Sequence, residues 1–296
     1  MKIPEITVLK ALYGDAAEEG KARYESLAKH YQELYHDDKM EFFSSPGRTE
    51  IVGNHTDHNG GKILAASIDL DTIGAAYPNG TDTIVIVSEG YDKKVIVNTA
   101  ALEKAPKNCG TVSLVAGMAE AAKKKGFQVS GFNAYISTKV ISAAGISSSA
   151  SFEMLICSMM NYFFNDGKMT CADYAKIGQY AENHFWDKAS GLMDQMACAV
   201  GGPIQLDFSD DVKYEKVDFD FARFGYNTGK GHADLSRVYS EIPEEMKAVA
   251  KVLGGEWLAD CSYEQLLDHY AEVQKTVGND RAILRALHYF EEKARV

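Results

Sequence analysis

The chain has 296 residues, of which 46% are hydrophobic and 25% are charged. This is the composition of an ordinary globular protein, and it argues against long disordered tails. The formal net charge of −11 argues against a general nucleic-acid binder, because affinity for a phosphate backbone depends on clustered lysine and arginine. We therefore expect no nucleic-acid partner, and any bound phosphate must be held by a local site.

The first half of the chain predicts one amphipathic helix followed by several short strands. Apolar residues recur at helical spacing between Glu18 and Tyr35. Runs rich in β-branched and aromatic residues then follow, separated by glycines and by the turn sequence PNG. These runs predict strands over 41–43, 48–52, 63–70, 72–77, 83–88 and 94–98.

The second half begins with helices and ends in a different pattern. It predicts a helix over 111–125, a strand over 132–142, and helices over 147–164 and 172–185. After residue 208 the pattern indicates two strands and then three helices. We therefore predict an α+β protein of two domains, with residues 1–201 in the first and residues 202–296 in the second.

The five cysteines and the apolar segments predict where the protein is found. The cysteines are odd in number, lie far apart and include no CxxC pair, so neither a disulfide framework nor a zinc cluster is indicated. Acidic residues interrupt the first twenty residues, and polar residues interrupt the most apolar later stretch, Phe152 to Phe164. These features predict no membrane partner and a cytoplasmic location.

The segment Ser45 to Ala66, SPGRTEIVGNHTDHNGGKILAA, concentrates polar side chains and has three interpretations. His55 and His58 could belong to a metal site, but no set of companion ligands stands at suitable spacing nearby. The segment could also be a polar turn with an Asx hydrogen bond. We favour a third interpretation, in which Asn54, His55, Asp57 and His58 supply donors and acceptors for the hydroxyl groups of a polar ligand.

The segment Ser142 to Glu153, SAAGISSSASFE, lies between a predicted strand and a predicted helix. The first N–H groups of a helix lack partners within it, and with the helix dipole they form a seat for an anion. A triphosphate would suit such a seat. The alternative is an ordinary serine N-cap. The segment matches neither the Walker pattern nor GxGxxG.

The segment Ala181 to Gly202 contains two carboxylates, Glu182 and Asp194. Asp194 has apolar neighbours, and a buried lone carboxylate is costly, so it must be paired or used. The alternative is an aspartate that caps the next helix. One carboxylate that accepts a proton from a hydroxyl and a second that holds Mg²⁺ would suit phosphoryl transfer, with Arg48 as the fixed cation.

Taken in order, these three segments resemble the galactokinases of the GHMP small-molecule kinase superfamily. The resemblance rests on Gly47-Arg48 through GNHTDHNGG, on GISSSAS and on ENHF…GLMDQ, and it extends over essentially the whole chain. It implies an ATP-dependent kinase that phosphorylates the C1 hydroxyl of galactose. It also implies an α+β GHMP kinase fold, with a ribosomal-protein-S5-domain-2-like N-terminal domain and an incomplete ferredoxin-like C-terminal domain.

The resemblance further implies the roles of particular residues. Asp194 is the carboxylate that faces the sugar C1 hydroxyl, Arg48 is the catalytic cation, and the two must converge beside the helix that begins after residue 145. The implied sugar contacts are Asn54, His55, Asp57, Gly191 and Tyr239. The implied contacts of the ATP phosphates are Ala144, Gly145, Ile146, Ser147, Ser148 and Ser149. The implied Mg²⁺ ligands are Glu182 and either Ser148 or Ser149.

Several positions depart from the family pattern. Asn54 replaces a sugar-binding glutamate, and because an amide donates as well as accepts, a kinase for a related sugar such as N-acetylgalactosamine is an alternative. Ile141 and Ala143 replace a proline and a glycine, and the methyl group of Ala143 would weaken nucleotide binding if that position requires a positive φ. Asp187 replaces another glycine.

The glycine-rich third motif of the family, similar to GGGFGG, is absent from the chain. That loop normally helps to order the nucleotide and close the site. We therefore expect a truncated C-terminal domain. This expectation leaves open a catalytically silent sugar and nucleotide binder as the alternative to an enzyme.

Overall fold

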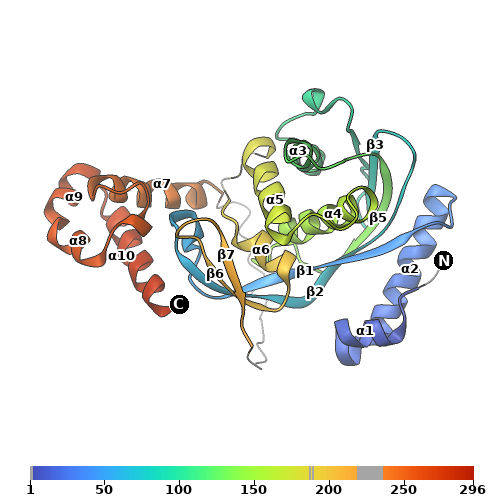
Figure 1. The fold of residues 1–296 in the computed structure, drawn as a ribbon, viewed down its shortest axis with the longest axis horizontal. Helices are drawn as coiled ribbons and strands as arrows, with labels where there is room; N and C mark the ends of the chain where they lie inside the picture. Colours follow the sequence, from blue (N-terminus) through green and yellow to red (C-terminus); the bar gives the residue numbers. More distant parts are fainter. Residues whose placement is uncertain (1–2, 187, 189, 219–235) are drawn as a thin grey trace.

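The computed structural model describes residues 3–186, 188, 190–218 and 236–296, and for residues 236–240 it describes the backbone alone. Its centre is a seven-stranded sheet with helices on both faces (Figure 1). The predicted α+β class is confirmed. The strands are β1 (Glu41–Val52), β2 (Lys62–Pro78), β3 (Thr83–Ser88), β4 (Val95–Asn98), β5 (Phe132–Thr138), β6 (Pro203–Asp207) and β7 (Lys213–Lys216).

The strand β2 organises the sheet. The strand order is β4-β3-β5-β2-β6-β7, and β1 pairs with β2 outside this path. The C-terminal half of β2 pairs with β5 and its N-terminal end pairs with β6. All of these pairs are antiparallel except β3 with β5, which is parallel. One strand thus connects the two ends of the sheet.

The sequence divided β1 and β2 into shorter strands, and this was wrong. The predicted strands 41–43 and 48–52 are parts of β1, and the predicted strands 63–70 and 72–77 are parts of β2. In β1, Pro46 and Gly47 suggested a break, but they coincide with a register shift between Pro46 and Arg48. A proline is tolerated there because β1 pairs with β2 alone among the described residues, and an edge strand can accept one.

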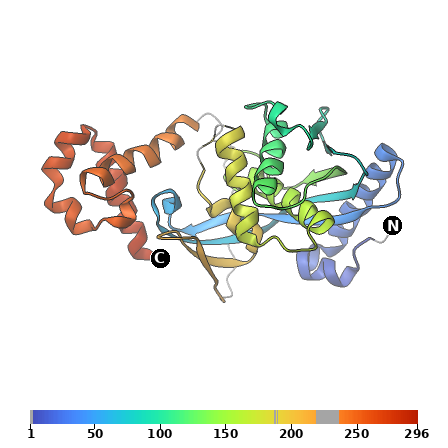
Figure 2. The ribbon, with the colours of Figure 1, turned by 45° about the horizontal axis from the view of Figure 1, so that its top comes forward.

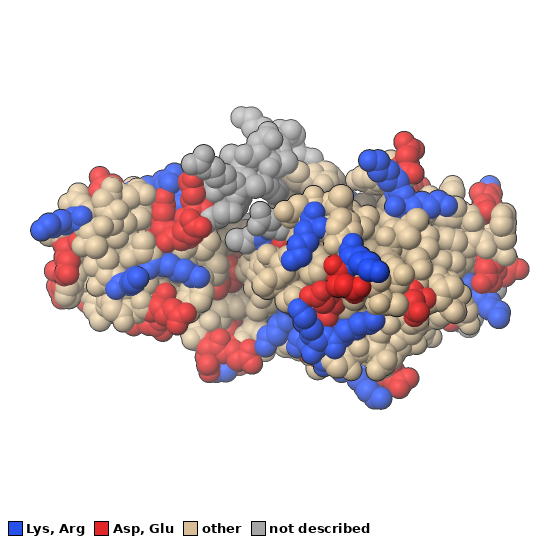
Figure 3. All heavy atoms as spheres, turned by 90° about the horizontal axis from the view of Figure 1, so that it is seen from above, with Lys and Arg blue, Asp and Glu red and all other residues tan. Residues whose placement is uncertain are grey.

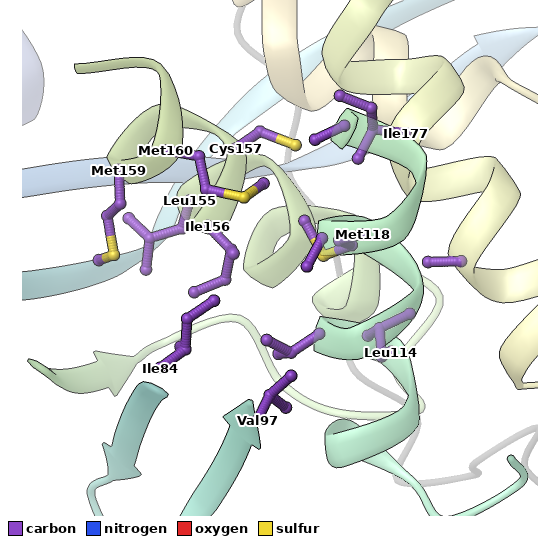
Figure 4. Close-up of a cluster of buried hydrophobic side chains, with 14 of the residues drawn as sticks. Ile84, Val97, Leu114, Met118, Leu155, Ile156, Cys157, Met159, Met160 and Ile177 are labelled. Carbon is purple, nitrogen blue, oxygen red and sulfur yellow. The ribbon is translucent and has the colours of Figure 1, made fainter. Parts of the chain in front are cut away.

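One face of the sheet is covered by α3 (Thr111–Lys124), α4 (Ser148–Phe164), α5 (Cys171–Phe185) and α6 (Met193–Val200). Figure 4 shows side chains of the sheet, such as Ile84 and Val97, meeting Leu114 of α3 and Leu155 of α4. All four side chains are at most 3% exposed. This core fixes α4 and α5 against the sheet, so the turn before α4 starts from a rigid base.

The opposite face is covered by α1 (Ile6–Tyr13) and α2 (Ala17–Tyr35). Leu27 and Tyr31 of α2 pack with Ile73 and Ala75 of β2. The neighbouring Ala76 faces the other core, as expected because successive strand residues point to opposite faces. The predicted helix Glu18 to Tyr35 corresponds to α2, whereas α1 was not predicted.

The sheet continues past residue 201, where the sequence placed a domain boundary. Both β6 and β7 lie beyond that residue, and β6 pairs with β2 from Lys62 to Ala66. The described residues after β7 form α7 (Ser236–Val252), α8 (Tyr263–Asp268), α9 (Tyr270–Val277) and α10 (Asp280–Arg295). We call these four helices the helical lobe. The division into two domains remains a prediction.

The helical lobe has its own small core and lies beyond one end of the sheet (Figure 2). Val249, Leu258, Ala286 and Tyr289 are fully buried in it.

On the face of the molecule seen in Figure 3, acidic side chains lie beside the basic ones. None of the helices in the described ranges combines the length and the apolar character that a membrane crossing requires.

Candidate active site

Arg48 lies where three segments of the chain meet. It follows the register shift at Pro46 in β1, and its side chain is 6% exposed. Its Nε and Nη2 atoms donate to Oδ1 of Asp194 over 2.8 and 2.7 Å. Its Nη1 atom donates to the carbonyl oxygen of Gly145 over 2.6 Å, and its backbone N–H donates to that of Ile146 over 3.2 Å. The residue therefore joins β1 to α6 and to the turn before α4.

Asp194 is the second residue of α6, but it does not cap that helix. The N-cap is Leu192, and no side chain caps the helix. The second carboxylate oxygen of Asp194 accepts a hydrogen bond from Oγ of Ser147 over 2.7 Å. The interpretation of Asp194 as a helix cap is wrong, and the predicted convergence of Arg48 and Asp194 beside the start of α4 is confirmed.

The surroundings of Asp194 keep it ionised. Burial raises the pKa of its carboxyl group, but the positive charge of Arg48, the electrostatic interaction with His55 and the hydrogen bond from Ser147 lower it by more. The net result is a pKa well below the usual value. Because its side chain is still 26% exposed, the carboxylate can be reached by a ligand. The site thus offers an ionised acceptor beside a buried cation.

The turn before α4 has an unusual backbone conformation. Ala143, Gly145 and Ser147 have φ angles of 59°, 76° and 57°, in the left-handed region that favours glycine. The sequence analysis expected the methyl group of Ala143 to weaken nucleotide binding if this position requires a positive φ. The structure gives Ala143 a positive φ. A Cβ atom added to Gly145 would meet no atom within 4 Å, so the turn is open at that point.

The first turn of α4 provides the expected seat for an anion. Ser147 precedes this helix, but its hydroxyl group bonds Asp194, and no side chain caps α4. The N–H of Ser151 donates to the carbonyl oxygen of Ser147 over 3.0 Å. The N–H groups of residues 148–150 therefore have no acceptor within the helix. The interpretation as an ordinary serine N-cap is wrong, and the helix dipole favours an anion there.

Residues 53–61 connect β1 to β2 and contain the 3₁₀ helix η2 (Thr56–Asn59). We call them the sugar loop, because the sequence predicts sugar contacts in them. Asn54 and His55 have φ angles of 44° and 58°, and asparagine tolerates this conformation better than most residues. The N–H of His55 donates to Oε1 of Glu50 over 2.8 Å. Across the described ranges, no three His, Cys, Asp or Glu side chains come together as metal ligands.

The sugar loop contacts the start of α6 through Asp57. Its Oδ2 atom accepts a hydrogen bond from the N–H of Met193 over 3.1 Å. A Cβ atom added to Gly191 would lie 1.8 Å from the same oxygen, so the Asp57 carboxylate packs directly on the Gly191 backbone. Two residues predicted as sugar contacts are thus adjacent, and one of them, Gly191, stands three residues before Asp194.

Glu182 lies near the start of α4, as the sequence predicted for a metal ligand. It is 1% exposed on α5. Its Oε1 atom accepts a hydrogen bond from Nζ of Lys188 over 2.6 Å, and its Oε2 atom accepts one from Nε2 of Gln195 over 3.3 Å. The Lys188 Nζ atom also lies 3.4 Å from Oγ of Ser149. Glu182 and Ser149 therefore face a common position, which Lys188 fills.

A second buried carboxyl group lies beneath Glu182. Glu153 of α4 is 0% exposed, and its Oε2 atom accepts a hydrogen bond from Gln195 over 3.1 Å. Burial and the charge of Glu182 raise the pKa of Glu153 well above its usual value. A Cβ atom added to Gly178 would lie 2.4 Å from the same oxygen. The absence of a side chain at Gly178 thus makes room for this carboxyl group.

The sequence analysis did not identify Glu153, Lys188 or Gln195. Two of them left a signal: Glu153 stands four residues after Ser149, on the same face of α4, and Gln195 directly follows Asp194. Lys188 stands in an irregular segment, where no periodicity indicates which way a side chain points.

The helical lobe also contacts the sugar loop. Oε2 of Glu292 in α10 accepts a hydrogen bond from the N–H of Gly53 over 3.2 Å, and Nδ2 of Asn59 donates to the sulfur of Met246 over 3.3 Å. The first of these contacts holds Gly53, the residue directly before Asn54, and the second holds the end of η2. The predicted sugar contact Tyr239 lies in α7, but its side chain is outside the described residues. Asp187, which replaces a glycine of the family, is also outside the described residues.

Comparisons with known proteins identify the family of this chain. The galactokinase galactose-binding signature matches residues 29–78, and the N-terminal domain of GHMP kinases matches residues 113–202. A galactokinase of Clostridium tetani is 30% identical over 275 residues, which cover 91% of this chain and 70% of that protein. The chain belongs to the galactokinase family. A galactokinase of Limosilactobacillus reuteri is 31% identical over 278 residues, which cover 90% of this chain and 70% of that protein.

Solved structures support the galactokinase assignment. The crystal structure of Lactococcus lactis galactokinase complexed with galactose has a TM-score of 0.82 and 28% identity, covering 92% of this chain and 72% of that chain. The mevalonate kinase of Methanococcus jannaschii, with a TM-score of 0.53 and 19% identity, shares the fold. The predictions of a GHMP kinase fold and of a galactokinase-type kinase are confirmed.

Proposed function

We propose that this galactokinase-family chain transfers the γ-phosphoryl group of ATP to the C1 hydroxyl of galactose. The observation that carries this proposal is the pairing of Arg48 with Asp194 beside the first amides of α4, which have no acceptor within that helix. Phosphoryl transfer needs an oriented nucleophile, a proton acceptor and positive charge around the migrating group. The signature over 29–78 and the galactose complex of the Lactococcus lactis relative support a sugar as the acceptor.

In this proposal Asp194 orients the C1 hydroxyl and accepts its proton. A carboxylate with a lowered pKa is a weak base, so the proton passes to Asp194 only as the new O–P bond forms. Arg48 keeps Asp194 charged and adds positive charge beside the migrating phosphoryl group. Its bond to the Gly145 carbonyl supports this role, since it ties the guanidinium group to the turn before α4.

The proposed sugar contacts are Asn54, His55, Asp57, Gly191 and Tyr239. The packing of Asp57 on Gly191 supports the inclusion of both, since it brings the sugar loop to the segment that carries Asp194. The left-handed conformations of Asn54 and His55 support a loop shaped for a ligand, because such conformations are held only where surrounding contacts enforce them.

The proposed phosphate contacts are the turn and first helical residues from Ala144 to Ser149. Glu182 and Ser149 fit Mg²⁺, because this ion takes one or two carboxylates and completes its shell with phosphate oxygens and water. When bound, Mg²⁺ neutralises charge on the phosphate oxygens. We favour Ser149 over Ser148 because the ammonium group held by Glu182 lies 3.4 Å from the Ser149 hydroxyl.

A coupled assay of ADP release from the purified chain tests this function. We expect release with galactose, ATP and Mg²⁺, and we expect Asp194→Asn to abolish it. The exposed Asp166, whose side chain is 87% exposed, gives the matched control Asp166→Asn. Thermal stabilisation by galactose and ATP without ADP release would contradict the proposal and favour a binding protein. Faster release with N-acetylgalactosamine than with galactose would contradict the proposed substrate.

A further inference from the structure

The ammonium group of Lys188 lies between the two side chains to which we assign Mg²⁺. Its Nζ atom donates a hydrogen bond to Oε1 of Glu182 over 2.6 Å and lies 3.4 Å from Oγ of Ser149. The Lys188 side chain is 46% exposed, whereas that of Glu182 is 1% exposed. A cation on a long, flexible side chain thus stands on the solvent side of a buried carboxylate, beside the first turn of α4.

The surroundings require positive charge at this position. A buried carboxylate without a partner is costly, and Gln195, which holds the second oxygen of Glu182, carries no charge. The ammonium group of Lys188, 2.6 Å from Oε1 of Glu182, is the positive charge that the structure places at this carboxylate. Lys188 therefore supplies, as an ammonium ion, the charge that a metal would supply.

We propose that Lys188 is a surrogate cation, which fills the magnesium position between Ser149 and Glu182 and meets the nucleotide phosphates when no metal is bound. This inference rests on the proposed nucleotide site at the start of α4. A second cation at the same carboxylate oxygen is repelled by the first, so Mg²⁺ bound to Oε1 of Glu182 favours the departure of the Lys188 ammonium group from that position. In this proposal the lysine makes nucleotide binding less dependent on the metal.

The test measures the affinity of the full chain for ADP by calorimetry, once with excess MgCl₂ and once with EDTA. Lys188→Met removes the charge and keeps an unbranched stem. We expect the metal-free affinity to fall by about tenfold or more and the affinity with Mg²⁺ to stay within about twofold or to rise. Lys188→Arg keeps the charge and is expected to retain most of the metal-free affinity.

Lys168→Met is the matched control, because Lys168 is 73% exposed and pairs with Asp166 away from the site. It should leave both affinities unchanged. If the ratio of the ADP affinity with Mg²⁺ to that with EDTA is the same in Lys188→Met and in the wild type, the role of Lys188 is overturned, whereas the proposed nucleotide site is not. A wild-type chain that binds ADP under neither condition would overturn both.

Galactose affinity, measured in the same way, reports whether each variant is folded. If the methionine variant has lost galactose binding, Lys188→Gln takes its place, because glutamine removes the charge and can still donate a hydrogen bond to Glu182. The ratio of the ADP affinity with Mg²⁺ to the ADP affinity with EDTA then decides. A ratio larger than that of the wild type supports the surrogate cation, and an unchanged ratio overturns it.

Discussion

Replacing Asp194 by alanine should destabilise the protein, because it leaves a buried guanidinium group without its carboxylate. The Arg48 side chain is 6% exposed and makes two hydrogen bonds to Asp194. Removing one partner of a buried ion pair costs about 3–5 kcal/mol. Asp194 is 26% exposed, and Arg48 keeps its bond to Gly145, so water and backbone replace part of the interaction. We expect the free energy of unfolding to fall by about 3 kcal/mol.

Urea denaturation followed by circular dichroism measures this loss. The double variant Arg48→Met/Asp194→Ala removes both charges, so it should be more stable than Asp194→Ala alone, although neither should have kinase activity. Asp166→Ala controls for the loss of an exposed aspartate. The reasoning is refuted if Asp194→Ala lies within about 0.5 kcal/mol of the wild type, or if the two substitutions destabilise additively.

The same pair gives a pH dependence with a defined sign. Folding lowers the pKa of Asp194, because burial raises it but the interactions with Arg48, His55 and Ser147 together lower it by more. Such a carboxyl group contributes stability above its unfolded pKa of about 3.9 and loses that contribution as the pH falls through its folded value. The stability difference between the wild type and Asp194→Asn should therefore be constant near neutral pH and shrink below about pH 4. A difference that grows on acidification would contradict this sign.

Three further substitutions test the geometry around the site. Gly191→Ala places a Cβ atom 1.8 Å from Oδ2 of Asp57, so that carboxylate must move, and galactose affinity measured by calorimetry should fall by about tenfold or more. Ala143→Gly relieves a φ of 59° and should raise the free energy of unfolding, measured in urea, by about 1 kcal/mol. Glu292→Gln weakens the acceptor of the Gly53 amide, so galactose affinity should fall about threefold to tenfold while ADP affinity is unchanged.

Neighbouring residues provide controls for these three substitutions. Ser190→Ala should leave galactose affinity unchanged, and an equal loss there would show that the loop is sensitive to any change. Ala144→Gly should not stabilise the protein, because Ala144 does not share the positive φ of Ala143. Glu291→Gln alters an exposed carboxylate one residue from Glu292, and an equal effect of both would remove the basis for the contact with the sugar loop.

The sequence predicted the pairing of Arg48 with Asp194 but not the buried contacts between the helices beside it. The approach of Arg48 to Asp194, 146 residues apart, followed from motifs whose order matched a family. The contact of Glu153 with Gln195 could not be predicted in this way, because it depends on how closely α4, α5 and α6 pack. Gly178 permits that packing only through the absence of a side chain, which has no local signature.

The fold shows the same contrast. Strand β3 was predicted at its observed bounds, Thr83–Ser88, because a short run of β-branched residues stands there between turn residues. Strand β1 was divided at Pro46 and Gly47, since local rules treat these residues as breaks. The structure needs Gly47 for a different reason: a Cβ atom there would lie 2.7 Å from the carbonyl oxygen of Ile146. The residue that suggested an interruption allows the turn before α4 to approach β1.

The contact between Glu292 and the amide of Gly53 makes the last described helix a neighbour of the sugar loop. Any ligand that orders this loop must also favour the attached position of that helix, because thermodynamic coupling between two sites is reciprocal. Galactose binding at this loop should therefore have a measurable effect on α10. Galactose should slow proteolytic cleavage within α10, and Glu292→Gln should abolish that protection.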